Sequence, residues 1–344
     1  MTAIPGKPGS GELTEVPEPA LADGSVLVDA LLLGICGTDL EVIEHGLGNQ
    51  PPGEERLILG HESLGRVLEA PAGTGLEPGD LVAGIVRHPD PVPCPACARG
   101  EADFCRNGLY TERGIRKRHG FGAEQWRVDP GFAVEVPAEL GDLGVLVEPG
   151  SDVAKVWEQV EMIGSRSWYE PATALITGAG PIGLLAALLG VQRGLEVYVL
   201  DQMEEGVKPS LVRDLGARYV TSLDQVGEQV DVAIECTGVG ALAYGAARLL
   251  APAGVLCLIG ISHREAELSV AYEALNRELV MKNAAIVGSV NAARRHFVDA
   301  VDALLEADRD WLGRLITRRV PLTRWQDALD RSPDDVKVVV DLQG

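Results

Sequence analysis

Three residues of this chain, far apart in the sequence, carry side chains that bind a borderline-soft metal ion. Cys36 lies in the glycine-flanked turn Gly34–Asp39, and His61 and Glu148 each stand at the end of an apolar run. A thiolate, an imidazole and a carboxylate are ligands that zinc accepts. Three protein ligands leave one of the four tetrahedral positions open, which is typical of a catalytic rather than a structural site. The three residue types therefore predict metal-assisted chemistry.

No member of this set is diagnostic alone, because a free cysteine in an apolar turn is usually just a small buried side chain. The sequence GICGTD at 34–39 together with GHE at 60–62, however, closely resembles the zinc-containing medium-chain alcohol and polyol dehydrogenases. The resemblance covers nearly the whole chain. It implies that the three residues above are ligands or near-ligands of a catalytic zinc. It also implies that Glu62 binds the zinc directly or exchanges with a water, and that Thr38 starts a proton relay.

A second metal site is indicated by Cys94, Cys97 and Cys105. Their spacing is C-x2-C-x7-C, in which two cysteines clamp a metal through a tight turn and a third returns from the next loop. The resembling family often binds a structural zinc here with four cysteines, and this chain has a proline in place of the first. The fourth ligand is then Asp90, one residue out of register, or His88. The alternative is a lobe of free thiols without metal.

The residues that would hold the substrate are implied by a narrower resemblance. The stretch ERGI at 112–115 and the segment GSVN at 288–291 resemble the glucose dehydrogenase branch of this family. In that branch the glutamate, here Glu112, hydrogen-bonds sugar hydroxyls beside the zinc, and the asparagine, here Asn291, reaches into the pocket. His88 is a third substrate-binding candidate. From the residues alone, a solvated loop carboxylate and an ordinary turn asparagine remain open.

A dinucleotide site is predicted in the second half of the chain by the motif G-x-G-x-x-G, which follows an apolar strand and opens an apolar helix. Its residues are Gly178, Gly180, Pro181, Ile182 and Gly183. The first glycine allows the tight turn, and the second lets a pyrophosphate approach the backbone. The third lets the helix pack close to the strand, with its N-terminus facing the phosphates.

The next predicted strand ends at Asp201, which decides the expected cofactor. A carboxylate at this position accepts hydrogen bonds from both hydroxyls of the adenosine ribose and repels a 2′-phosphate. We therefore expect NAD in preference to NADP, although Lys208 would still accommodate a phosphate. The nicotinamide half is expected at the carboxyl ends of later strands, near Cys236, Thr237 and Gly260.

Two kinds of domain must position these residues. From Ser25 to about Val86, short apolar runs alternate with turns, which is typical of a compact β-rich domain. The resemblance implies a GroES-like barrel here. Farther on, six strands alternate with helices, which predicts a doubly wound parallel sheet in an α/β fold. We expect a GroES-like catalytic domain at 1–150, completed by 292–344, and a Rossmann NAD(P)-binding domain at 151–291. The expected strands of the parallel sheet lie at 174–177, 197–200, 217–220, 230–235, 255–261 and 283–290, and a terminal strand lies at 337–342.

The composition of the chain limits the classes of binding partner and the cellular location that we expect. The formal net charge of −21 makes nucleic acid and anionic membranes poor partners. The longest nearly uncharged run, 175–191, contains glycines and a proline and fits a buried strand–turn–helix better than a membrane span. No signal-peptide core is evident, and the cysteine distribution fits a reducing compartment. We expect a cytoplasmic protein with His263 and His296 structural or exposed, and the resemblance implies a homodimer or homotetramer.

Together these features predict a zinc-dependent NAD(P) oxidoreductase that oxidises a sugar or polyol hydroxyl, with glucose or another aldose as the expected substrate. Zinc would lower the pKa of the hydroxyl, and hydride would pass to nicotinamide. The alternative within the family is another zinc dehydrogenase, acting on linear polyols, cyclitols or simple alcohols, including one in specialised biosynthesis. It would share every zinc and dinucleotide residue. A zinc-free quinone reductase or a non-catalytic nucleotide-binding protein is the alternative from a different class. The complete cysteine–histidine–glutamate set argues against it.

Overall fold

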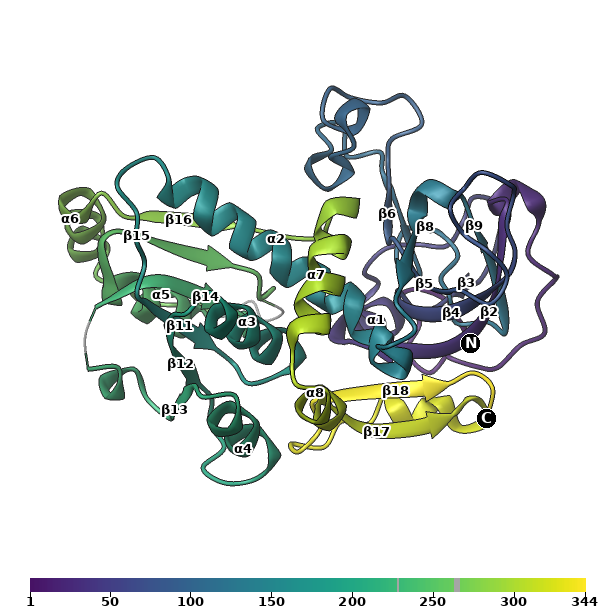
Figure 1. The fold of residues 1–344 in the computed structure, drawn as a ribbon. Coiled ribbons are helices and arrows are strands. Elements are labelled where there is room, and N and C mark those ends of the chain that lie inside the picture. Colours follow the sequence, from purple (N-terminus) through teal and green to yellow (C-terminus); the bar gives the residue numbers. More distant parts are fainter. Residues whose placement is uncertain (228, 263–266) are drawn as a thin grey trace. The chain divides into compact units, whose positions relative to one another are not determined.

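The computed structural model describes residues 1–227, 229–262 and 267–344, so His263 lies outside the described residues. Within these residues the chain forms two compact units (Figure 1). Unit 1 consists of Met1–Ser151 and Asn291–Gly344, and unit 2 of Asp152–Val290. The chain therefore leaves unit 1 after Ser151 and returns to it at Asn291.

Unit 1 is built around a mostly antiparallel sheet. Its described strands follow the order β10-β5-β4-β2-β18-β17, and β9 also pairs with β2. The strands of unit 1 are β1 (Thr2–Ala3), β2 (Val26–Ile35), β3 (Leu57–Ile58), β4 (Glu62–Glu69), β5 (Leu81–Gly84), β6 (Arg87–His88), β7 (Thr111–Arg113), β8 (Lys117–Arg118), β9 (Gln125–Val128), β10 (Ala133–Val136), β17 (Ile316–Pro321) and β18 (Lys337–Asp341). Its helices are α1 (Gly37–Leu40), α7 (Arg294–Glu306) and α8 (Arg309–Leu315), with short turns at η1 (Leu21–Asp23), η2 (Glu41–His45), η3 (Cys97–Arg99), η4 (Ala102–Phe104), η5 (Pro130–Phe132), η6 (Gly141–Leu146) and η8 (Leu322–Ala328).

Strand β2 is the central strand of this sheet. Its first half alternates buried and half-buried side chains, as expected for a strand with one face toward solvent, whereas its last four residues are all buried. The buried half lies between β4 and β18, and β18 places Val338 opposite Ile35. The predicted C-terminal strand therefore lies beside the strand that leads directly into Cys36, although the two come from opposite ends of the chain.

Unit 2 contains the predicted doubly wound sheet. Its six described strands are all parallel in the order β13-β12-β11-β14-β15-β16, which is the order of dinucleotide-binding folds. The strands are β11 (Thr173–Thr177), β12 (Glu196–Leu200), β13 (Arg218–Val220), β14 (Val230–Glu235), β15 (Leu250–Leu258) and β16 (Ala285–Gly288). The helices are α3 (Pro181–Gln192), α4 (Val207–Asp214), α5 (Gly240–Leu249) and α6 (Tyr272–Lys282), with a short turn at η7 (Leu223–Gln225). The prediction of a parallel α/β sheet is confirmed.

Four helices were not predicted, of which α1 and α8 are short. Helix α2 (Val147–Gly164) begins in unit 1 and continues into unit 2, and it starts where the sequence analysis saw only an apolar run ending in Glu148. Pro149 concealed it, although proline is well tolerated in the first turn of a helix. Helix α6 has no fully buried residue, and its half-buried face carries only Ala274, Leu275 and Leu279 as apolar side chains, which is a weak helix signal.

Two further expectations concern single features. His296 is fully buried on α7, and its Nδ1 accepts a hydrogen bond from the N–H of Ala293 at 2.9 Å, which makes it structural, as expected. Throughout the described part of the chain, no helix combines the length and the apolar character that a membrane crossing needs.

Candidate active site

Cys36 and His61 meet at the end of strand β2. Cys36 directly follows β2 and is the N-cap of α1, where its sulfur accepts a hydrogen bond from the N–H of Thr38 at 3.2 Å. His61 directly precedes β4, which pairs with β2, and its Nε2 lies 3.3 Å from Sγ of Cys36. Strand pairing thus brings together two residues that are 25 positions apart in the sequence.

A carboxylate that the sequence analysis missed orients this pair. Asp39 is 2% exposed, and its Oδ2 accepts a hydrogen bond from the N–H of Cys36 at 2.9 Å. Its Oδ1 lies 3.5 Å from Nδ1 of His61. A carboxylate behind Nδ1 fixes the ring so that Nε2 can face a metal, as around many metal-binding histidines. One feature of the sequence could have revealed Asp39: it lies three residues after the N-cap residue Cys36, which is the spacing of a capping box.

The charges of this cluster compensate one another. Burial disfavours a charge on His61, but the carboxylate of Asp39 and the sulfur of Cys36 raise the pKa of His61 well above its ordinary value. Burial likewise disfavours the ionised form of Asp39, but His61 holds the pKa of Asp39 below its ordinary value. The cluster is therefore built around one positive charge. A metal ion would supply that charge and leave the imidazole neutral, as ligation requires.

Two further carboxylates reach the same histidine. The ligand atoms of His61, Glu62 and Glu148 lie within 4.8 Å of one another, and so do those of Cys36, Asp39 and His61. Glu148 lies in the first turn of α2, where the helix N-terminus stabilises a negative charge. His61 belongs to both groups of ligand atoms, which together offer a sulfur, an imidazole nitrogen and carboxylate oxygens. This donor set fits zinc.

Glu62 has a buried cationic partner that was not predicted. Nζ of Lys337 lies 2.7 Å from Oε1 and 2.5 Å from Oε2 of Glu62, and the two side chains are only 1% and 3% exposed. The carboxylate lies over Gly34, where any Cβ would overlap Oε2. The ion pair joins β4 to β18 and balances the charge of Glu62 beside His61.

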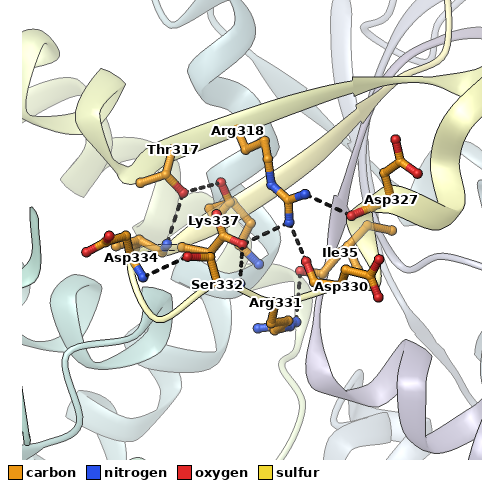
Figure 2. Close-up of polar contacts among 11 residues, drawn as sticks. Ile35, Thr317, Arg318, Asp327, Asp330, Arg331, Ser332, Asp334 and Lys337 are labelled. Carbon is orange, nitrogen blue, oxygen red and sulfur yellow. Dashed lines mark hydrogen bonds and ion pairs between the residues drawn. The ribbon is translucent and has the colours of Figure 1, made fainter.

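A polar network on the segment before β18 holds Lys337 in place (Figure 2). Thr317 donates to the carbonyl oxygen of Lys337 at 3.3 Å, and Arg331 donates to that of Ile35, the residue before Cys36, at 3.4 Å. Arg318 on β17 binds three groups of the segment between β17 and β18, which are the carbonyl oxygens of Asp327 and Asp330 and Oδ2 of Asp335. The C-terminal segment therefore orders both the cation and the chain next to the candidate metal ligand.

The two substrate-binding candidates that the sequence places far apart, Glu112 and Asn291, contact each other in unit 1. Nδ2 of Asn291 donates to Oε1 of Glu112 at 3.1 Å, and Asn291 has a φ of 60°, a left-handed conformation that asparagine tolerates better than most residues. The turn after Glu112 packs on Gly60, because a Cβ on Gly114 would overlap the carbonyl oxygen of Gly60. Gly60 precedes His61. The turn that carries Glu112 thus lies against the segment that carries the candidate metal-binding histidine.

Arg87 and His88 are neighbours on strand β6 but lie on opposite faces of it. Arg87, which was not predicted, donates from Nε and Nη2 to Oε1 of Glu112 at 3.0 and 2.8 Å. His88 is buried and stacks on Phe132, with ring centroids 4.0 Å apart. Burial and the nearby Arg118 guanidinium lower the pKa of His88 to about 2, so its ring is neutral. The structure therefore brings Arg87, and not the predicted His88, to Glu112.

The three-cysteine lobe brings its thiols together. Sulfur atoms within 4.8 Å of one another belong to Cys94, Cys97 and Cys105. The expected fourth ligand, Asp90, is not part of this group, because its Oδ1 accepts a backbone N–H two residues on and its Oδ2 accepts the side chain of Asn107 at 2.7 Å. The N–H groups of Cys97 and Arg106 donate to the sulfur of Cys94 and lower its pKa to about 6, which favours the thiolate that metals bind.

The glycine-rich loop of unit 2 has the geometry that phosphate binding requires. Gly178 has a φ of 89°, which a side chain would disfavour. A Cβ on Gly180 would meet no described atom within 4 Å, so the backbone there is open to a ligand, whereas a Cβ on Gly183 would overlap the carbonyl oxygen of Gly178. Pro181 and Ile182 form the first turn of α3, whose N-terminus favours an anion.

Asp201 directly follows β12 and folds back on this loop. Its Oδ2 accepts the N–H of Ala179 at 2.6 Å, and its Oδ1 accepts the N–H of Gln202 at 2.7 Å. These bonds hold the carboxylate beside the glycine-rich loop, where the adenosine ribose is expected. Lys208 lies in the first turn of α4.

A buried glutamate shapes the turn at the carboxyl end of β14. Glu235 is 1% exposed, and it accepts the N–H groups of Thr237 and Gly238 at 2.7 and 3.0 Å. The end of β15 packs directly on this turn, because a Cβ on Gly260 would overlap the backbone nitrogen of Gly238. Burial raises the pKa of Cys236 well above its ordinary value, so this thiol is neutral. Glu235 was missed as an organiser because acidic residues at strand ends are common.

Two family models together match almost the whole chain. The alcohol dehydrogenase GroES-like domain matches residues 22–138, and the glucose dehydrogenase C-terminus matches residues 141–342. Glucose 1-dehydrogenase of Thermoproteus tenax is 42% identical, covering 100% of this chain and 99% of its own, and that of Methanocella arvoryzae is 38% identical, covering 98% of each. The structure of Haloferax mediterranei glucose dehydrogenase in complex with NADP, Zn and gluconolactone has a TM-score of 0.91 at 33% identity over 100% of both chains.

Proposed function

Because the chain belongs to the glucose dehydrogenase branch of the zinc-dependent medium-chain dehydrogenases, we propose that it oxidises the anomeric hydroxyl of glucose or a close epimer, with NAD as the preferred acceptor. The observation that carries this proposal is the convergence on His61 of a cysteine sulfur and two carboxylates. The turn that bears Glu112 packs on the same segment. Unit 1 would be the catalytic domain and unit 2 the NAD(P)-binding domain.

The residues around His61 take distinct roles in this reaction. Cys36, His61 and Glu148 would hold the catalytic zinc, which when bound lowers the pKa of the substrate hydroxyl. Asp39 orients the imidazole from behind. Glu62, paired with Lys337, can lie beside the metal ligands without adding an unbalanced charge. To bind the zinc or exchange with a water, it would have to give up a contact with Lys337.

The substrate-side residues handle the sugar hydroxyls and the proton. Glu112 would accept a hydrogen bond from a sugar hydroxyl, with Asn291 holding the carboxylate from one side. Thr38, whose backbone N–H already bonds Cys36, would relay the proton of the anomeric hydroxyl toward solvent. Bound NAD would accept the hydrogen of the anomeric carbon as hydride, so that the hemiacetal would be oxidised to a lactone and NAD reduced to NADH.

The preference for NAD rests on Asp201. Its carboxylate is held beside the glycine-rich loop and carries a charge that repels a 2′-phosphate. Haloferax mediterranei glucose dehydrogenase has been solved with NADP, so the choice of cofactor is to be measured for this chain directly. Thr237 and Gly260, on the turns shaped by Glu235, would lie on the nicotinamide side, with Cys236 a packing residue.

The three-cysteine lobe would hold a second, structural zinc, with the fourth position filled by a ligand other than Asp90 in its present hydrogen bonds. Metal analysis of the purified protein tests this. Two zinc ions per chain are expected, and a single zinc that is lost on replacing Cys36 would contradict it.

We also propose a cytoplasmic homodimer or homotetramer. All six cysteines are free thiols, which suits a reducing compartment. Strand β16 is an edge of its sheet and exposes Ile286, while α6 exposes Val280 and Met281 at 66% and 76%. Apolar side chains gathered at an exposed edge mark an association surface. Light scattering after size-exclusion chromatography should give a dimer or tetramer mass, and a monomer would contradict this expectation.

A substrate panel tests the proposed function. Zinc-loaded protein is given NAD or NADP with aldoses, cyclitols, linear polyols and simple alcohols, and nicotinamide reduction is followed by absorbance. We expect the highest kcat/KM with glucose or a close epimer and NAD. Turnover confined to a cyclitol or a linear polyol would keep the chemistry but reject the sugar assignment. An absence of turnover on every alcohol by zinc-loaded protein would reject the function.

A further inference from the structure

We propose that Arg87 is a positioning residue that fixes one oxygen of Glu112 and thereby presents the other oxygen to a sugar hydroxyl. This inference rests on the proposed sugar oxidation, in which Glu112 binds the substrate. Arg87 and Glu112 are directly opposed partners of strands β6 and β7, so their side chains project from the same face of the pair.

Every hydrogen bond that the described residues make to the Glu112 carboxylate falls on one of its oxygens. Oε1 accepts Nε and Nη2 of Arg87 at 3.0 and 2.8 Å and Nδ2 of Asn291 at 3.1 Å. The side chains of Arg87 and Glu112 are only 6% and 10% exposed, so these charge-assisted bonds are largely shielded from water. Three donors exceed the two lone pairs of a carboxylate oxygen, so Oε1 has no capacity left for a substrate.

The second oxygen of Glu112 is free. Oε2 accepts no hydrogen bond from the described residues. It is also not fully buried, so it remains accessible to a ligand. A carboxylate oxygen accepts hydrogen bonds and cannot donate them while it is ionised. The group that it recognises must therefore be a donor, and on a sugar that donor is a hydroxyl.

Arg87 is itself held on two other sides. Its guanidinium lies over the ring of Tyr110, 3.9 Å from the centroid, and Nη1 donates to the carbonyl oxygen of Asp103 at 3.1 Å. Asp103 belongs to the η4 turn of the three-cysteine lobe, two residues before Cys105. Arg87 therefore cannot follow Glu112 if the carboxylate turns, and it keeps Oε2 in a fixed direction before any sugar arrives. Such preorganisation favours one hydroxyl position over others.

A double-variant cycle tests this role. The enzymes are wild type, Arg87→Met, Glu112→Gln and the double variant, and KM and kcat are measured for glucose and for each of its monodeoxy analogues. We expect Arg87→Met to raise KM for glucose about 10- to 100-fold, the range for a charge-assisted hydrogen bond. Arg87→Met should also reduce the ratio of kcat/KM for glucose to kcat/KM for one particular deoxy analogue. In the Glu112→Gln background the same replacement should change KM by no more than about twofold, because the residue through which Arg87 acts is already altered.

Arg116 provides the matched control. Its guanidinium also lies over the ring of Tyr110, 4.7 Å from the centroid, but its side chain donates to the carbonyl oxygen of Gly108 and not to Glu112. Arg116→Met should leave the preference among deoxy sugars unchanged. Arg87→Lys, which keeps the charge but cannot present two donors from a planar group, should lie between wild type and Arg87→Met. If Arg87→Met does not fold, as judged by zinc content and NADH binding, Arg87→Lys takes its place in the cycle.

The outcomes separate this role from the proposed function. Wild type without activity on any sugar contradicts the function itself. An active wild type whose Arg87 variants lose activity equally on glucose and on every deoxy analogue contradicts the positioning role. So does an equal effect of the Arg87 replacement in the wild-type and Glu112→Gln backgrounds. Loss of selectivity at one hydroxyl, seen only while Glu112 is present, supports it.

Discussion

Replacing Lys337 with methionine should strongly destabilise unit 1, because it leaves the carboxylate of Glu62 buried without its cation. Both oxygens of Glu62 contact Nζ of Lys337, at 2.7 and 2.5 Å, and the two side chains are 1% and 3% exposed. Removing one partner of such a pair costs about 3–5 kcal/mol. For a unit of roughly 200 residues this corresponds to a fall in melting temperature of about 10 °C.

The cost arises from the unpaired charge and not from the lost contact, which a second substitution can show. Replacing Glu62 by leucine in the Lys337→Met protein removes the orphaned carboxylate, and we expect it to restore most of the lost stability. Gly34, beneath the carboxylate, leaves room for the new side chain. The matched control is Arg319→Met, because Arg319 pairs with Asp142 at 2.6 Å with both side chains about half exposed; its loss should cost less than about 1 kcal/mol.

Equilibrium urea unfolding of chelator-treated protein measures these values without a contribution from bound metal. The expected order of stability is wild type and Arg319→Met, then the double variant, then Lys337→Met. The reasoning is refuted if Lys337→Met lies within 1 kcal/mol of wild type. It is equally refuted if the double variant is no more stable than Lys337→Met.

Two further predictions concern pH and cofactor choice. Burial lowers the pKa of His88 to about 2, so below about pH 6.5 the imidazole is protonated in the unfolded chain but stays neutral in the folded one. The free energy of unfolding is therefore highest above pH 6.5 and should fall by about 2 kcal/mol from pH 7.5 to pH 5 because of this residue. His88→Phe, which keeps the stacking on Phe132, should flatten the acid limb of a urea-unfolding series by that amount, and an unchanged slope would contradict the assignment. Asp201→Asn removes the charge that repels a 2′-phosphate, so the ratio of kcat/KM for NAD to that for NADP should fall about tenfold or more; an unchanged ratio would exclude Asp201 as the discriminating residue.

The dinucleotide site was the part most open to prediction from sequence. Its residues are contiguous, and each glycine has a separate steric reason that the structure bears out at Gly178 and Gly183. The parallel sheet followed from alternating apolar strands and helices. The strand boundaries agree within three residues except at β15, which begins at Leu250, five residues before the predicted start. Helix α6 was missed because its half-buried face carries few apolar side chains, so its apolar period is weak.

The candidate ligands of the metal site could be named from the sequence, and the structure brings them together, but their partners could not be predicted. Cys36, His61 and Glu148 were found from residue type and motif. Lys337 could not be found in this way, because it meets Glu62 only through the pairing of β18 with β2 and of β2 with β4. Arg87 was hidden for a similar reason: on a two-residue strand, nothing in the sequence tells which of two neighbours faces Glu112. His88, which was named as a substrate-binding candidate, is buried against Phe132.

The central claim is that a metal held at Cys36 and His61 carries glucose oxidation. The most direct measurement is glucose-dependent NADH formation by chelator-treated protein as zinc is added, with Cys36→Ala measured in parallel and NADH binding followed for both. Wild type should rise from no activity to full activity as zinc binds, while Cys36→Ala should bind NADH normally and remain inactive at every zinc concentration. Full glucose oxidation by the zinc-free wild type, or normal turnover by Cys36→Ala, would contradict the claim.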